Sequence, residues 1–405
     1  MSIRHERLHA APKLVREAAV AVTEIEKTNR LLLIGSFAVA LPVLAAQLPE
    51  ERADAMYHLY DGGGVTVSGP SILVRKQFGE SFSASANYYV DAISSASIDV
   101  VTTASPYTEN RTEISASVDY LYGNSQMNLG YTNSEESDYS ADTIHFSIGQ
   151  DLFGDLTNVT LGYSRGSDEV RRNGDSGFSD EVTRNSFSLA LNQVVTANTL
   201  FALSWETIAD EGFLNNPYRS VRYLDASSAT GYSFESEVYP RTRTSNALSA
   251  RLRYHLPYRA ALSGEYRYFS DTWGITAHNT ELDTELGYTH PLGDNWTFDL
   301  SYRYYTQNGA DFYSDLFPRV QSQNYLARDK ELSSFSSHSV GFGMSYKLLR
   351  ESWKMVDSAS LNLAYNYLYF NYRDFRDISQ SEAVGEEPLY ELSANVMRLY
   401  LSVYY

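Results

Sequence analysis

The chain contains no cysteine, few basic residues and only one long apolar run. Without cysteine, thiol catalysis, thiolate metal sites and a lipoprotein anchor are excluded. Its 32 Lys and Arg face 50 Asp and Glu, which gives a net charge of −18. This acidity argues against nucleic acid as a partner. It suits loops that bind divalent cations among lipopolysaccharide, or simply a solvated acidic exterior.

Two short motifs associated with catalysis occur, but in unsuitable contexts. HExxH occurs at residues 5–9, ahead of the one long apolar run, and Gly-x-Ser-x-Gly occurs at residues 162–166, at the end of an alternating segment rather than at a strand-to-helix turn. The sequence has no phosphate-binding loop. His338 follows Ser336 and Ser337, but neighbours along a strand point to opposite faces and cannot form a dyad by themselves. We therefore expect no enzyme activity, no catalytic residue and no cofactor, and we leave metal binding open.

The single apolar run covers residues 31–46 and follows two basic residues. Its 16 residues are short for a membrane-spanning helix, and small residues around Ala45 offer a cleavage site. The pattern predicts a signal peptide over residues 1–45, with an N-terminal anchor helix as the alternative. Because the stretch before the run is long, we expect a misassigned start, with Val20 or Val22 as the initiator.

Alternation of apolar and polar residues is the dominant pattern in the rest of the chain. It occurs near residues 70–78, 81–92, 112–122, 125–133, 141–151, 156–165, 183–194, 198–208, 244–255, 259–270, 278–290, 294–306, 337–348, 358–370 and 393–405. Each segment has about ten residues, enough to cross a bilayer at a tilt, whereas soluble strands average five or six. Many of the 33 tyrosines lie at segment ends, as in the aromatic belts of membrane barrels. The fold class predicted is an all-β, transmembrane antiparallel β-barrel.

The connections between these segments alternate between short and long, as do periplasmic turns and extracellular loops. Fifteen strands cannot leave both ends of the wall in the periplasm. Residues 51–64 therefore form a sixteenth strand or climb through the lumen, with a reversal at Gly62-Gly63-Gly64. We favour sixteen strands, with fourteen as the alternative. The domains expected are 46–64, a first strand or lumenal segment, and 65–405, the outer-membrane β-barrel.

Charged residues recur at the inward positions of neighbouring predicted strands. They are Arg251, Arg253, Glu265, Arg267, Glu281, Asp283, Glu285, Asp299 and Arg303. Alternating signs on adjacent strands predict a lumenal ladder of ion pairs. The ladder would serve as a polar conduit or docking wall, or would only hydrate and stiffen the interior.

The predicted loop over residues 307–319 holds Asp311, Tyr313 and Asp315. These residues are candidates for binding a cation or a partner. The alternative is that the loop folds inward as a constriction or covers the mouth of the barrel.

Several longer segments resemble the DUF3570 family. They are residues 54–64 (DAMYHLYDGGG), 69–76 (GPSILVRK), 95–107 (SASIDVVTTASPY), 212–222 (GFLNNPYRSVR), 266–274 (YRYFSDTWG) and 311–319 (DFYSDLFPR). The resemblance covers nearly all of the chain after the predicted signal peptide. It implies the outer membrane of a Gram-negative bacterium and supplies no catalytic residues. Three of the segments lie in predicted loops (95–107, 212–222 and 311–319), which suggests a folded extracellular cap or an inward-bent constriction.

The resemblance further implies a periplasmic flavin transferase, a small lipoprotein and a thioredoxin-like protein as associates. Together these features predict a conduit or docking scaffold for an extracytoplasmic redox or metal-linked system. The alternatives are a general diffusion porin and a barrel enzyme acting on lipid or peptide. The partners expected are the lipid bilayer, lipopolysaccharide, the barrel-assembly machinery, which would read Tyr405, and a periplasmic redox protein or small lipoprotein.

Overall fold

A computed structural model of the protein describes residues 47–95, 107–256, 260–282, 290–292, 295–349, 356–380 and 383–405. The predicted signal peptide over 1–45 lies outside the described residues, and so do Asp283 and Glu285. None of the described residues forms a helix long and apolar enough to cross a membrane.

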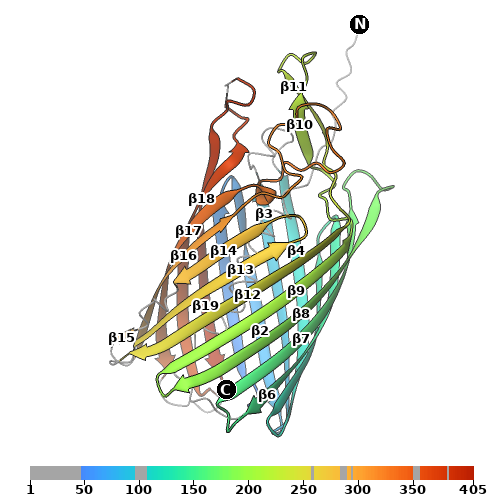
Figure 1. The fold of residues 1–405 in the computed structure, drawn as a ribbon. Coiled ribbons are helices and arrows are strands. Elements are labelled where there is room, and N and C mark those ends of the chain that lie inside the picture. Colours follow the sequence, from blue (N-terminus) through green and yellow to red (C-terminus); the bar gives the residue numbers. More distant parts are fainter. Residues whose placement is uncertain are drawn as a thin grey trace.

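Long antiparallel strands form a single wall (Figure 1). The first half of the wall is β1 (Arg52–Gly62), β2 (Val65–Phe78), β3 (Phe82–Ser95), β4 (Tyr107–Tyr122), β5 (Ser125–Glu135), β6 (Tyr139–Leu152), β7 (Thr157–Arg171), β8 (Ser179–Thr196) and β9 (Thr199–Gly212). The second half is β12 (Thr242–Leu256), β13 (Ala260–Asp271), β14 (Thr276–Leu282), β15 (His290–Leu292), β16 (Trp296–Gln307), β17 (Phe335–Leu349), β18 (Ser358–Arg376) and β19 (Leu389–Tyr404).

The wall is closed and has sixteen strand positions. Strand β1 pairs with β2 on one side and with β19 on the other, and β9 pairs with β12. Strands β14 and β15 both pair with β16 and together take one position. The prediction of a sixteen-stranded antiparallel barrel is confirmed, and the fourteen-stranded alternative is wrong.

Residues at the start of the barrel occupy the wall and do not climb through the lumen. Every residue from Arg52 to Gly62 has a partner on both β2 and β19. The chain then reverses at Gly63 and Gly64, whose φ angles of 59° and 77° are left-handed and favour glycine. This is the reversal that the sequence predicts.

The outer face of the wall is apolar. On β2, Ile72, Val74 and Phe78 are 53%, 45% and 59% exposed, while Ser71 and Arg75 alternate with them on the inner face. The same alternation continues around the wall, because side chains on a strand point to opposite faces in turn. A belt of exposed apolar side chains around a closed sheet fits a hydrocarbon surrounding, and the fold is that of a membrane-spanning barrel.

The two ends of the barrel differ. At one end the strands are joined by turns, such as Gly79–Ser81 between β2 and β3 and residues 153–156 between β6 and β7. At the other end lie the long loops, which include the hairpin of β10 (Ser220–Leu224) and β11 (Tyr232–Ser236) and the 3₁₀ turn η1 (Lys330–Leu332). By the pattern of membrane barrels the turns are periplasmic and the loops extracellular. Figure 1 shows the β10–β11 hairpin standing beyond the rim of the wall.

Candidate functional site, a charged lumen and its extracellular cap

The inner face of β9, β12 and β13 holds two ion pairs formed by predicted lumenal residues. Arg251 and Glu265 are directly opposite each other, with Nη2 2.5 Å and Nε 2.6 Å from the Glu265 Oε2 atom. Farther along, Arg267 lies 3.7 Å from Glu206 on β9, a residue that the sequence analysis did not single out. These two ion pairs form part of the predicted lumenal ladder. Their side chains remain partly exposed to the lumen.

The remaining lumenal candidates are placed as follows. Glu281 is buried on β14, opposite Glu265 on one side and Arg303 on the other. Asp299 lies opposite Gly343, and a side chain added at Gly343 would approach Asp299 to 3.0 Å. The structure therefore brings seven of the nine candidates to one arc of the inner wall, and the other two lie outside the described residues.

Part of this arc borders a recess of about 280 Å³ near the periplasmic end of the lumen. Arg251 and Arg253 line it together with Asn158, Asn192 and Gln193. Apolar residues line the rest of the recess, among them Leu156, Leu200 and Phe201. The charged arc therefore borders a recess of mixed polar and apolar lining.

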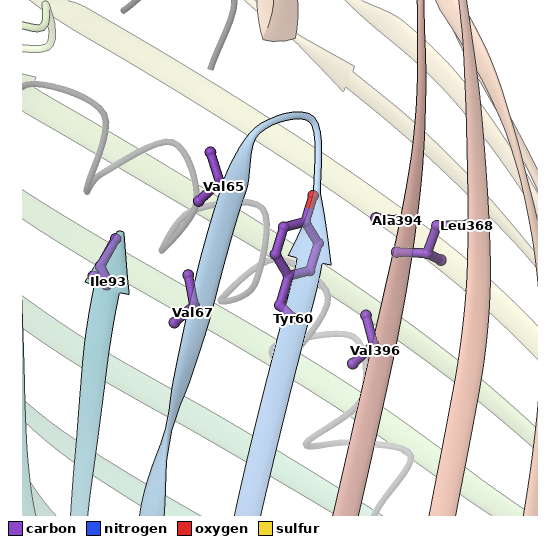
Figure 2. Close-up of a cluster of buried hydrophobic side chains, with 7 residues drawn as sticks. All are labelled: Tyr60, Val65, Val67, Ile93, Leu368, Ala394 and Val396. Atoms are coloured by element: carbon purple, nitrogen blue, oxygen red, sulfur yellow. The ribbon is translucent and has the colours of Figure 1, made fainter. Parts of the chain in front are cut away.

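A second arc of the inner wall, at the extracellular end, is apolar instead. Figure 2 shows its cluster of buried side chains, which is formed by Tyr60, Val65, Val67, Ile93, Leu368, Ala394 and Val396. They come from β1, β2, β3, β18 and β19, so the cluster bridges the seam where the barrel closes. Aromatic residues of β16 to β19 extend it toward the rim, among them Phe335, Tyr372 and Phe375. The lumen thus has one charged arc and one apolar arc.

A buried polar cluster on β1, β3 and β4 lies beside this second arc. It was not predicted from the sequence. His58 Nε2 lies 2.7 Å from Asp91 Oδ1, and the His58 ring stacks on Tyr89 with centroids 4.7 Å apart. Arg111 donates to Glu113 at 2.7 Å and to Asp91 at 3.5 Å. These residues lie on three strands and are spread over about 55 positions of the sequence. They come together because β1 pairs with β2, β2 with β3 and β3 with β4.

The long loops fold into one body, which we call the cap. It comprises the described residues of 213–241, 308–334 and 377–388, the connections β9–β12, β16–β17 and β18–β19. Arg222 is at its centre and is completely buried. Its guanidinium donates to Asp315 Oδ2 at 2.5 Å and to Glu387 Oε1 at 2.5 Å. One side chain therefore joins loops from three different hairpins.

Further contacts repeat this pattern around Arg222. Arg328 Nε donates to Asp315 Oδ1 at 3.1 Å, and the Arg328 guanidinium lies over the ring of Phe375 at 4.5 Å. Arg219 forms a second buried ion pair, with Asp329. Short backbone bridges tie the same loops together, including Tyr223 to Phe317. The predicted folded cap is confirmed for the segments 212–222 and 311–319, whereas most of 95–107 lies outside the described residues.

An aromatic cluster anchors the cap to the wall. Tyr239, Trp273 and Phe312 pack edge to face or tilted, with ring centroids 5.2 to 5.5 Å apart. Trp273 belongs to the β13–β14 turn, and its indole N–H donates to the carbonyl of Thr242 at 2.9 Å. The neighbouring Gly274 has a φ of 85°, and a side chain there would collide with Asp311 at 2.3 Å. The three segments 212–222, 266–274 and 311–319 therefore meet within the cap or at its base.

The three loop candidates have different surroundings. Asp315 accepts from Arg222 and Arg328 and is part of the buried network. The Tyr313 hydroxyl donates to the carbonyl of Asp374 at 3.1 Å, and Asp311 is exposed beside Gly274. Two of them therefore hold the cap together. No group of three or more His, Asp or Glu among the described residues is arranged to hold a metal ion.

The electrostatics of the cap follow from burial and from its ion pairs. Burial raises the pKa of the Tyr313 hydroxyl well above its ordinary value, and the nearby Asp315 adds to the effect. Burial alone would raise the pKa of Glu387, but the hydrogen bond and the charge of Arg222, together with hydrogen bonds from backbone N–H groups, outweigh burial and lower that pKa. The pKa of Arg222 is raised, because its bonds to Glu387 and Asp315 outweigh the opposing effect of burial. Both partners stay charged near neutral pH.

His338, the histidine that follows two serines, forms a hydrogen bond with a tyrosine. Its Nδ1 lies 2.8 Å from the Tyr302 hydroxyl on the outer face, next to the Tyr304 ring. Ser337 is buried on the other face of the strand. The alternation expected from the sequence separates the two side chains.

The barrel is similar to solved structures of bacterial outer-membrane proteins. The siderophore receptor PirA from Pseudomonas aeruginosa is 11% identical with a TM-score of 0.39, and the match covers 88% of this chain and 63% of the receptor. This chain therefore spans less than two thirds of that receptor. A bacterial polysaccharide outer membrane secretin is 9% identical with a TM-score of 0.45, covering 88% of this chain and all of that one. The outer membrane protein opdK from Pseudomonas aeruginosa is 9% identical with a TM-score of 0.40, covering 87% and 99%.

No curated protein matches the sequence. The family described as "Protein of unknown function (DUF3570)" matches residues 98–186 and 176–367, which together exceed half of the chain. The segments 54–64 and 69–76 precede the matched region, so the match is shorter than the sequence resemblance implies. It includes the cap segments 212–222 and 311–319 and the wall segment 266–274, and the chain belongs to the DUF3570 family.

Proposed function

We propose that this protein is an outer-membrane conduit whose extracellular mouth is controlled by the cap, and that it has no enzyme activity of its own. The observation that carries the proposal is the position of Arg222, completely buried among loops from three hairpins. Loops joined in this way form a folded element at the mouth of the barrel. A charged inner arc, with Arg251 and Glu265 as its best-defined pair, gives the lumen a polar path.

The proposal separates this protein from a general diffusion porin. A porin would give steady ohmic conductance in planar lipid bilayers. A capped conduit should stay mostly closed as the wild type and conduct after the cap is loosened by Arg222→Gln. Conductance of the wild type equal to that of the variant would contradict the role of the cap.

The wider role that we propose is export or uptake for an extracytoplasmic system in a Gram-negative bacterium. The flavin- and metal-linked associates implied by the family resemblance would then act on the periplasmic side, supplying or receiving the solute. Crosslinking of the intact protein in membranes with a purified periplasmic redox partner tests this step. A crosslink at the short turns supports it, and the absence of any crosslink would remove the redox partner from the proposal while leaving the conduit.

Delivery to the membrane is also part of the proposal. We propose export by a signal peptide within residues 1–45 and insertion by the barrel-assembly machinery. The apolar outer face of the closed wall supports insertion into a bilayer. Sequencing the N-terminus of the mature protein tests the signal peptide, and an N-terminus before residue 31 would contradict it.

A further inference from the structure

Two arginines face each other at the periplasmic end of the lumen. Arg52 on β1 and Arg75 on β2 are directly opposite in the antiparallel register. Both point inward, because the neighbouring Ala53 and Val74 form the opposite pair and Val74 is exposed on the outer face. Side chains in such a pair start about 5 Å apart, and the charge of Arg52 acts on the Arg75 guanidinium.

This pair is only partly neutralised by the described residues. Arg52 Nε lies 3.1 Å from Asp54 Oδ2, within ion-pair distance but without hydrogen-bond alignment. Arg75 forms no ion pair with a described residue, and its buried Nε has no hydrogen-bond partner there. Asp119 and Asp54 act on Arg75 from beyond ion-pair distance. Asp119 accepts from Asn128 at 2.8 Å through Oδ1 only, and Asp119 Oδ2 and Asp54 Oδ1 are buried without a hydrogen-bond partner among the described residues.

The contrast with the charged arc is informative. There, Arg251 donates through two nitrogens to one carboxylate directly across the strand pair. At Arg52 and Arg75 the partner across the strand pair is a second positive charge, which is unfavourable unless an anion lies between them. Guanidinium groups match the geometry of phosphate and carboxylate oxygens through paired N–H donors.

We propose that Arg52 and Arg75 form an oxyanion-binding site at the periplasmic end of the lumen, which takes the phosphate or carboxylate group of a small solute. As a step in transport the site rests on the proposed conduit. As a binding site it stands by itself, since the Arg52 side chain is 33% exposed and a solute can reach it from the periplasmic end.

Titration calorimetry on the purified, detergent-solubilised barrel tests the site. Inorganic phosphate is the probe in one arm and succinate in the other, each at low salt. We expect saturable binding of at least one probe, weakened about tenfold by Arg75→Gln and by Arg52→Gln. Raising the ionic strength should weaken the wild type as well, because a partly exposed site is screened. Whichever probe binds shows whether the site takes a phosphate or a carboxylate group.

Matched variants keep the test decisive. Arg184→Gln on β8 also removes an inward-facing arginine, but one whose Nε lies 2.7 Å from Asp210 on β9 and that lies outside the recess. The affinity of this variant should stay within about twofold of the wild type. Arg75→Lys keeps the charge, loses the paired donors and should fall between Arg75→Gln and the wild type. Each variant is first shown to be folded by circular dichroism.

The proposal is overturned if neither probe binds the folded wild type, or if Arg52→Gln and Arg75→Gln bind like Arg184→Gln. If the protein is not a conduit, the outcome of these experiments differs from the outcome expected if the site is absent. A barrel that never conducts in bilayers, yet loses phosphate or succinate binding on Arg75→Gln, refutes transport and retains the site.

Discussion

The cap and the lumenal wall both contain arginine–carboxylate pairs, but they place them in different surroundings. Arg222 in the cap is completely buried between Asp315 and Glu387, whereas in the wall the side chains of Arg267 and Glu206 are 34% and 41% exposed at 3.7 Å. A buried pair that loses one partner leaves a charge without compensation, whereas an exposed pair is solvated anyway. The same chemistry therefore fixes the geometry of the cap and only sets the electrostatic field of the lumen.

The largest effect should come from Arg222→Gln. The substitution leaves Asp315 and Glu387 buried without their shared partner, at a cost of about 3–5 kcal/mol to the folding of the cap. Limited proteolysis should then cleave residues 213–241 and 308–334 while the wall stays folded.

Arg241→Gln is the matched control. Arg241 also pairs with a carboxylate, Asp180, but its side chain is 62% exposed, so the proteolysis pattern should not change. If the cap of Arg222→Gln resists proteolysis as well as the wild-type cap, burial does not make the ion pairs of Arg222 essential.

Phe312→Ala should have the next largest effect. Phe312 is buried against Tyr239 and Trp273. Removing its ring leaves a cavity at the base of the cap and destabilises the cap by about 3 kcal/mol. Hydrogen exchange should rise in the cap without rising in β12 or β13. Exchange that rises in both regions would mean that cap and wall fold as one unit. The contrast between a separately stabilised cap and the wall would then be wrong.

Acid should loosen the cap before it affects the wall. The pKa of Glu387 lies below its ordinary value of 4.5, so its contribution to stability is complete above that value. The contribution is lost as pH falls through the lowered pKa of the folded state. The protection factors of the cap amides, which are corrected for the pH dependence of intrinsic exchange, should therefore fall as the pH drops below 4.5. In Glu387→Gln, where the titrating group is absent, this acid-dependent loss of protection should be smaller.

The smallest effect is expected from Arg267→Gln in the wall. Because the pair with Glu206 is exposed, the free energy of unfolding in guanidinium chloride should change by about 0–1 kcal/mol. A loss above 3 kcal/mol would place this pair in the same class as Arg222.

The wall could be predicted from the sequence, since the period of two is a local property. Alternation around residues such as Trp296, Phe298 and Leu300 fixes which side chains meet lipid, and glycines mark the reversals. Counting the strands limited residues 51–64 to the wall or the lumen, and the pairing of β1 with β2 and β19 decided for the wall.

The cap contacts could not be predicted in the same way. Arg222 meets Glu387 across 165 positions, and neither lies in a periodic segment. The segment 212–222 indicated an ordered loop, but nothing local identifies Arg222 as its buried centre. The cluster at His58 and Asp91 was missed for a related reason, because inward charges look alike in sequence whether they face water or one another.

The seam between the first and last strands has a consequence for the order of folding. The hydroxyl of Tyr405 donates to the carbonyl of Arg75, 330 positions away, and β1 pairs with β19 along the whole length of β1. Contacts between such distant segments form slowly, because the intervening chain must first be brought together. Until then β1 and β19 each present an unpaired edge, which readily pairs with other chains. Closure of the seam is therefore the step at which this barrel most needs protection from aggregation.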